Sequence, residues 1–332
     1  MQPSLFTPEV DWSPPSSFPE LSNYSEVAID LETHDPLLLS HGPSWAFSNT
    51  GHVTGIAIAT KDFNMYFPIE HKGGGNLDKN MVLTWFTKQM SYNNDKIFHN
   101  ALYDLGWIKR LGIEVNGTIH DTMFAAPLIN ENQYGYSLNK LGERYLNEVK
   151  DEKLLKEAAN AYSLDPKKDM WKLPAKYVGL YAEQDAGLTL KLWQLFKDLL
   201  KSENVEKIYE LETGLIPILL NMRYKGVPVD LDVAERVGKQ LKKEEEDILN
   251  GIKKEHGVYP DLWAAASVAT VFDRAGLAYP RSPKINAPSF TSDWLESHDN
   301  KLAKDIGRAR KLNKARTTFI DKMILEHSVE GR

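Results

Sequence analysis

The chain has 332 residues, a net charge of −6 and no cysteine. The missing cysteines exclude disulfides, thiolate zinc sites and cysteine nucleophiles, and they fit a cytoplasmic location. The apolar runs are too short to cross a membrane, and the length favours two domains. Proline and serine are frequent in residues 1–21, so we expect a loose lead-in there and not a signal peptide.

The N-terminal half has the pattern of strands followed by helices. In residues 26–33, Val27, Ile29 and Leu31 face one way, whereas Asp30 and Glu32 share the opposite face of the predicted strand. Asn100 is placed to cap the helix that starts there. Further strands are predicted at residues 53–60, 65–69, 96–99 and 118–121.

Helices dominate the second half. Pro174 opens a predicted helix that runs to about Lys201, and Tyr181 and Asp185 lie on its apolar stripe. From residue 205 the pattern is almost entirely helical, and a basic helix is predicted over residues 301–327. We therefore predict an α/β domain over residues 22–202, followed by a helical region over residues 203–332.

Four acidic residues carry the functional argument. Asp-x-Glu alone is usually a pair of solvated acids, and Asp104 alone would be an exposed acid in the first turn of a helix. Asp185 differs, because its stripe should face the sheet and a buried carboxylate needs a cation or several donors. The positions one turn away are Tyr181 and Thr189, although an arginine from elsewhere could also pair with it.

Together the four acids indicate a metal site. Two carboxylates about 4 Å apart repel by roughly 4 kcal/mol at an effective dielectric constant near 20, so such a cluster takes up protons or recruits cations. Clustered oxygen ligands without cysteine suit Mg²⁺ or Mn²⁺. Two such ions are the equipment for phosphodiester hydrolysis.

The order and spacing of the motifs resemble the DnaQ-like 3′–5′ exonucleases. These enzymes have a ribonuclease H-like α/β fold with a mixed central sheet, and the third motif here is of the tyrosine type. The motifs are Asp30-Leu-Glu32, Asn100-Ala-Leu-Tyr-Asp104 and Tyr181-Ala-Glu-Gln-Asp185. The resemblance implies that Asp30, Glu32, Asp104 and Asp185 hold two metal ions, with Asp104 binding through water. It implies further that Tyr181 and Glu32 orient the attacking water.

Other segments resemble family A DNA polymerases, especially those of phages. Residues 137–141 and 171–178 match the exonuclease part, Gly226-Val-Pro-Val-Asp230 the start of the polymerase part, and residues 309–316 the end of its thumb. The sequence stops about where the palm would begin. The resemblance implies a proofreading exonuclease with a thumb-like region, acting in the host cytoplasm if a phage encodes it. Polymerase activity is not expected from this chain alone.

The resemblance also suggests contacts with DNA. Asn100 would contact the single-stranded 3′ end, and basic residues on one side of the last helix would track duplex phosphates, although a solvated surface is the simpler interpretation. These basic residues are Lys304, Arg308, Lys311, Lys314 and Arg316.

Two alternative functions stay open. The first is a free-standing nuclease of the RNase D or Werner type, acting on RNA or structured DNA. The second is a non-catalytic DNA-binding or assembly subunit that holds a separate polymerase chain with palm and fingers.

Overall fold

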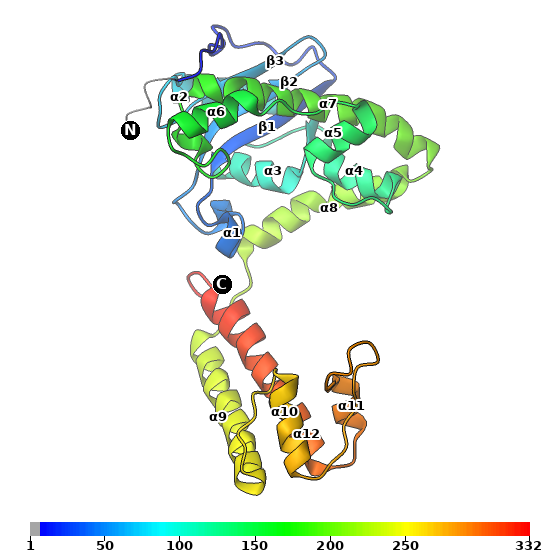
Figure 1. The fold of residues 1–332 in the computed structure, drawn as a ribbon. Helices are drawn as coiled ribbons and strands as arrows, with labels where there is room; N and C mark the ends of the chain where they lie inside the picture. Colours follow the sequence, from blue (N-terminus) through cyan, green and yellow to red (C-terminus); the bar gives the residue numbers. More distant parts are fainter. Residues whose placement is uncertain (1–6) are drawn as a thin grey trace. The chain divides into compact units, whose positions relative to one another are not determined.

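The computed structural model describes residues 7–332, which form two compact units (Figure 1). The first unit ends at Lys225, and the second is Gly226–Arg332. This boundary corrects the predicted one at residues 202/203. Helix α8 (Glu206–Lys225) belongs to the first unit, because its Ile216 and Leu220 join the core beneath the sheet.

A five-stranded mixed sheet forms the centre of the first unit, in the order β3-β2-β1-β4-β5. β1 pairs in antiparallel with β2 and in parallel with β4, and this arrangement confirms the predicted α/β fold with a mixed sheet. All the predicted strands are present within a residue or two. They are β1 (Glu26–His34), β2 (His52–Ala59), β3 (Asn64–Pro68), β4 (Asp95–Phe98) and β5 (Ile119–Asp121).

Helices cover both faces of this sheet. One face packs against α4 (Thr122–Ile129), α5 (Leu138–Leu146), α6 (Lys153–Ala161) and α7 (Gly179–Ser202). The other packs against α2 (Lys79–Met90), α3 (Ala101–Arg110) and α8. The short helix α1 (Leu38–His41) follows β1. The side chains of Val27 and Ile29 enter the second core and Ala28 the first, so β1 alternates as its sequence predicts.

The described part of the lead-in packs against the first unit. Trp12 donates from Nε1 to Glu183 at 3.0 Å, and Leu21 is fully buried. The backbone carbonyl of Pro19 accepts a hydrogen bond from Trp85. Residues 7–20 contain no strand or helix, but hydrogen bonds attach them to the rest of the first unit. Residues 1–6 of the predicted lead-in lie outside the described part.

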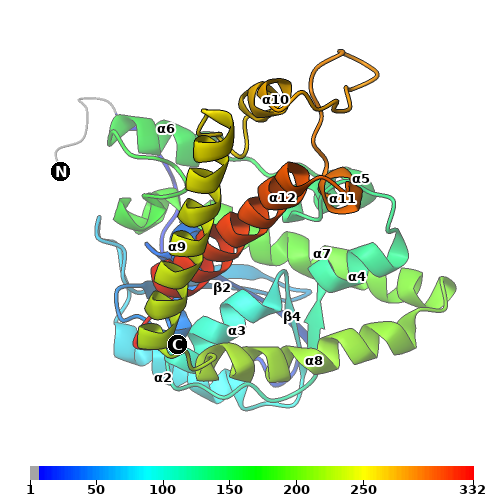
Figure 2. The ribbon, with the colours of Figure 1, turned by 90° about the horizontal axis from the view of Figure 1, so that it is seen from below.

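The second unit is helical, as predicted, and has its own apolar core of residues such as Leu249, Phe272 and Ile306. Asp230 caps α9 by accepting a hydrogen bond from the backbone of Val233. α12 and the segment after it lie beside α9 (Figure 2). The helices are α9 (Leu231–His256), α10 (Ala265–Arg274), α11 (Ser292–Ser297) and α12 (Lys301–Lys314), and α12 continues as a π-helical segment (Ala315–Glu326). Across residues 7–332, no helix is long and apolar enough to span a membrane.

Candidate metal centre

Three of the four predicted acids converge on one point. One carboxylate oxygen each from Asp30, Glu32 and Asp185 lies within 4.8 Å of the others. Asp30 and Glu32 are half-buried, and Asp185 is buried. An all-oxygen set of this size fits a hard divalent cation, so the residues present suit the predicted metal.

The secondary structure explains why these acids meet. Asp30 and Glu32 project from the same face of β1, and α7 packs across that face and carries Asp185. Ala57 and Gly55, both small, pair with Asp30 and Glu32 on the neighbouring strand. A side chain at Gly55 would collide with the Tyr66 ring, because its Cβ would lie 2.1 Å from the Tyr66 hydroxyl oxygen.

Asp104 reaches the same strand from α3. Its side chain is buried, and its Oδ1 accepts a hydrogen bond of 3.1 Å from the backbone N–H of Leu31. Leu31 lies between Asp30 and Glu32, so this bond holds Asp104 beside the acidic cluster. Asp104 is not one of the three residues whose oxygens share the 4.8 Å site.

Lys150 is a feature of the site that the sequence argument missed. Its Nζ lies 2.6 Å from the Asp185 carboxylate and 3.1 Å from the hydroxyl of Tyr181. The Lys150 side chain is only 7% exposed. Asp185 is therefore paired with a cation from 35 positions earlier in the chain. No local pattern reveals this pair, because Lys150 lies in a charged connection between two helices.

The surroundings of these acids raise their pKa values. Burial, followed by the charge of Asp185, raises the pKa of Asp30 to about 7. Burial and the charge of Asp30 likewise raise the pKa of Glu32 and that of Asp104. Burial also raises the pKa of Asp185, while the nearby Lys150 ammonium opposes the increase. Without a bound cation, the folded site therefore disfavours its own full set of charges.

Asn100 occupies the position before α3, as predicted, but its side chain does not cap the helix. Its backbone has a left-handed conformation with φ of 74°. Asp121 caps α3 instead, because its carboxylate accepts hydrogen bonds from the backbone N–H groups of Asn100 and Ala101. The side chain of Asn100 is exposed and makes no capping bond.

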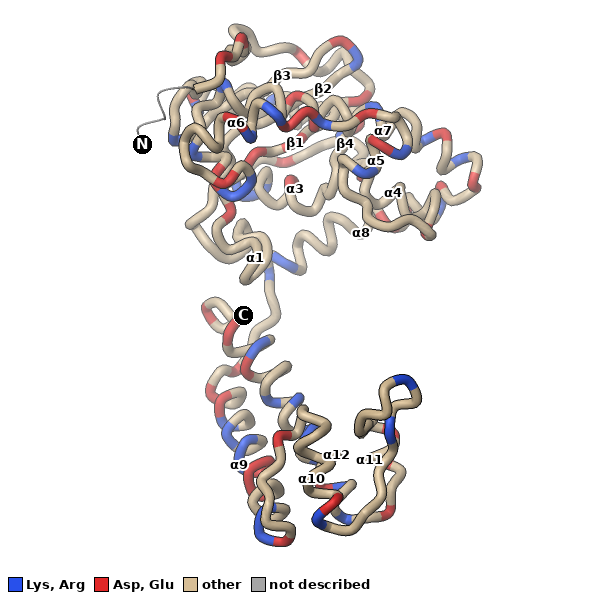
Figure 3. The backbone as a smooth tube through the Cα atoms, viewed as in Figure 1, with Lys and Arg blue, Asp and Glu red and all other residues tan. Residues whose placement is uncertain are grey.

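Four of the five predicted DNA-binding residues on the last helix are exposed. Acidic residues lie among them, and Figure 3 shows both charges along α9 and α12. Three of the four have acidic partners: Lys304 with Asp299 at 4.0 Å, Arg308 with Glu244 at 3.4 Å and Lys311 with Glu296 at 2.8 Å. Lys314 is the fourth.

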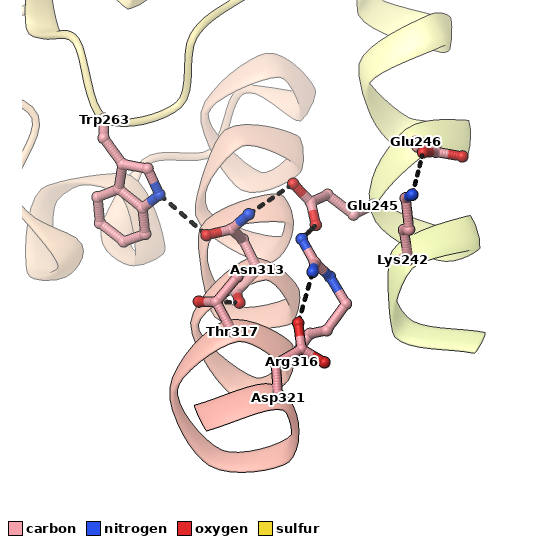
Figure 4. Close-up of polar contacts among 8 residues, drawn as sticks. All are labelled: Lys242, Glu245, Glu246, Trp263, Asn313, Arg316, Thr317 and Asp321. Atoms are coloured by element: carbon pink, nitrogen blue, oxygen red, sulfur yellow. Dashed lines mark hydrogen bonds and ion pairs between the residues drawn. The ribbon is translucent and has the colours of Figure 1, made fainter. Parts of the chain in front are cut away.

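Arg316 departs from the predicted exposed face. Its guanidinium lies 2.8 Å from Asp321 and 3.6 Å from Glu245, and its side chain is only 20% exposed (Figure 4). Glu245 also accepts a hydrogen bond from Asn313. The helix changes from α to π at residue 315, and this change accompanies the inward position of Arg316. Arg316 therefore links the last helix to α9 inside the second unit.

Comparison with known proteins shows the family of the sheet-containing part of the chain. Residues 16–201 match a family described as 3′–5′ exonuclease, and the acidic cluster lies within this match. The chain belongs to this 3′–5′ exonuclease family. The chain is thus related to nucleases, and its acidic cluster has the oxygen ligands that divalent metals prefer.

The chain is also similar to parts of DNA polymerases. It is 35% identical to a DNA-directed DNA polymerase of Pseudomonas phage M6, over all of this chain and 51% of that protein. It is 27% identical to DNA polymerase I of Borreliella burgdorferi, over 90% of this chain and 31% of that protein. The predicted resemblance to the N-terminal exonuclease part of family A polymerases is confirmed. The chain spans about half the length of its phage relatives.

A solved structure supports the fold over both units. The chain superposes with a TM-score of 0.66 on the POL domain of Pol1 from M. smegmatis, determined in complex with DNA primer-template and dNTP. The match covers 94% of this chain and 48% of that one, at 17% identity. At this identity the likeness establishes the fold alone.

The raised pKa of Asp30 predicts a pH-dependent effect on stability. Its pKa is about 7 in the folded chain against an ordinary value of 3.8, so the folded state retains a proton that the unfolded state has lost. The free energy of unfolding should therefore fall as the pH rises from about 4 to about 7. In chelator at pH 8, Asp30→Asn should be more stable than wild type by on the order of 1–3 kcal/mol.

Urea unfolding at a series of pH values measures this difference. The advantage of Asp30→Asn should shrink towards pH 4, where the wild-type carboxyl is protonated in both states. A difference that is the same at every pH would contradict the raised pKa.

Proposed function

We propose that this chain is a metal-dependent 3′–5′ exonuclease that removes nucleoside 5′-monophosphates from the 3′ ends of DNA in proofreading. The convergence of the Asp30, Glu32 and Asp185 carboxylates carries the proposal, within a domain of the 3′–5′ exonuclease family. The polymerase names of the relatives favour DNA over RNA as the substrate. The phage relatives favour the host cytoplasm as the place of action.

In this proposal four acids bind two divalent ions, Mg²⁺ or Mn²⁺. Asp30, Glu32 and Asp185 would bind directly, and Asp104 would bind through water. When bound, such ions supply a hydroxide near neutral pH and stabilise the leaving 3′ oxygen. Glu32 and the Tyr181 hydroxyl would orient the attacking water. The exposed side chain of Asn100 would contact the single strand.

Degradation of labelled DNA tests this function directly. With 5′-labelled single-stranded DNA and Mg²⁺ or Mn²⁺, we expect a ladder that shortens from the 3′ end. The ladder should vanish with chelator, and Asp30→Ala/Glu32→Ala should reduce the rate by at least about a thousandfold, since loss of the ions removes most of the catalysis.

A matched control tests whether the loss of activity is specific to the acids of the cluster. Glu206→Ala/Glu210→Ala removes two exposed acids from α8 and should keep the wild-type rate. Undiminished cleavage by the Asp30→Ala/Glu32→Ala variant would contradict the assignment of the site, and faster cleavage of a matched RNA would favour an RNase D-type nuclease.

We also propose that the second unit grips duplex DNA, as a thumb would. The proposal is supported by four exposed basic side chains, those of Lys304, Arg308, Lys311 and Lys314. A bound phosphate would compete with the acidic partners of the first three. Arg316 is left out of this surface because Glu245 and Asp321 engage it. Each lysine that contacts a phosphate displaces about one counterion, so binding through these residues depends on salt.

Duplex binding at different salt concentrations tests this grip. Lys311→Ala/Lys314→Ala should weaken binding to every duplex sequence and reduce the salt slope by about 2. Hydrolysis of single-stranded DNA should change little. The control Lys239→Ala/Lys242→Ala removes two exposed lysines from α9 and should bind as wild type. If Lys311→Ala/Lys314→Ala abolished single-strand hydrolysis instead, the assignment of a duplex grip would be wrong.

A second candidate role is assembly with a polymerase polypeptide, and α8 favours it. Tyr209, Ile216 and Leu220 are buried against the sheet domain, whereas a second apolar row on α8 is exposed. That row, spaced three and four residues apart, is Ile208, Leu211, Leu215, Ile218 and Met222. A helix that is apolar on two sides usually lies between two cores. We propose that the polymerase half of its relatives, which this chain does not match, covers this row.

Co-elution during gel filtration tests the assembly. The chain should form a complex with the C-terminal half of the phage M6 polymerase, its 35%-identical relative. Leu211→Glu/Met222→Glu should lose the complex, because both side chains are 63% exposed and their burial as charges is costly. Separate elution of the wild-type chains would contradict the proposal.

A further inference from the structure

The connection between α5 and α6 delivers a positive charge to the acidic cluster. Residues 147–152 have no regular secondary structure, and Lys150 lies near the middle of them. The carboxylates, in contrast, are fixed on a strand and two helices. The ammonium is therefore attached to the more adaptable part of the site.

Lys150 is closely engaged where it lies. Its Nζ donates to Asp185 at 2.6 Å and to the Tyr181 hydroxyl at 3.1 Å, and it lies 4.3 Å from the centre of the Tyr181 ring. These are two of the residues assigned to the reaction. The same ammonium also acts electrostatically on Asp30 and Glu32. A single side chain thus compensates several of the negative charges.

A divalent cation and the Lys150 ammonium compete for the Asp185 carboxylate. The Asp185 oxygens belong to the group that could hold a metal ion, and Lys150 is already paired with that carboxylate. Two cations a few ångströms apart repel each other as strongly as two anions do. Metal binding at Asp185 therefore has to displace or weaken the contact with Lys150.

We propose that Lys150 is a displaceable counter-cation, which holds Asp185 and Tyr181 in place until a divalent ion takes over that carboxylate. The proposal rests on the proposed metal-dependent function of the same site. Lys150 then acts as a positioning residue and sets the metal concentration at which the site fills. It stabilises the metal-free protein and weakens metal binding at the same time.

The opposite signs of these two effects provide the test. Lys150→Met should lower the melting temperature in chelator, because the acids lose their partner. It should also bind Mn²⁺ more tightly, by about tenfold, since one positive charge no longer competes for the carboxylate. Mn²⁺ binding is measured by electron paramagnetic resonance without DNA, and melting by circular dichroism with and without Mn²⁺.

A merely structural lysine would give a different result. Its loss would lower the melting temperature and weaken Mn²⁺ binding together, because a distorted site binds metal less well. Lys150→Arg keeps the charge and should restore both values towards wild type. Lys153→Met is the matched control, since Lys153 begins α6 and is 79% exposed, and it should change neither value.

Two outcomes overturn the proposal. One is unchanged or weaker Mn²⁺ binding by Lys150→Met, and the other is a melting temperature in chelator that does not fall. If Lys150→Met does not fold, Lys150→Gln serves as the second neutral variant in both measurements. Mn²⁺ binding is measured without DNA, so the two proposals can fail separately. If Lys150→Met bound Mn²⁺ more tightly but the wild-type protein cleaved no DNA, the proposed exonuclease function would be refuted and this inference would stand.

Discussion

The mutual repulsion of carboxylates on β1, α3 and α7 is the constraint to which the first unit is adapted. The sheet places Asp30 and Glu32 on one face, and α7 brings Asp185 against them. Such a concentration of negative charge is unfavourable in a folded protein unless protons or cations accompany it. The raised pKa of Asp30 and the contact of Lys150 with Asp185 are two responses to the same repulsion. Affinity for divalent ions would be the third.

Much of this site could be predicted from sequence because its elements are regular. The period of two in residues 26–33 placed Asp30 and Glu32 on one face, and the helical period placed Tyr181 and Asp185 on one stripe. The order of the motifs indicated the family, and the family implied the fold. Lys150 could not be predicted, because its segment has no periodicity and its contact with Asp185 depends on tertiary structure. The role of Asp121 as the cap of α3 was missed because its contacts with Asn100 and Ala101 depend on tertiary structure.

The helical unit shows where patterns of charge mislead. Counting basic residues along the last helix predicted one continuous face that includes Arg316. The side chain of Arg316 instead turns towards Glu245 and Asp321, at the start of a π-helical segment that a period of 3.6 does not anticipate. The domain boundary had a similar cause. α8 reads as one more helix of a helical region, yet its buried side belongs to the core of the sheet domain.

Asp121 connects three elements around the site with one residue. Its carboxylate accepts hydrogen bonds from the backbones of Ala101 and Met123, at the starts of α3 and α4, and its own N–H donates to Tyr209 of α8. Because α3 carries Asp104, its start cannot pivot independently of α4 and α8. A variant that removes the acidic cluster should therefore keep Asp121 intact, since its replacement would also disturb the packing of these three helices.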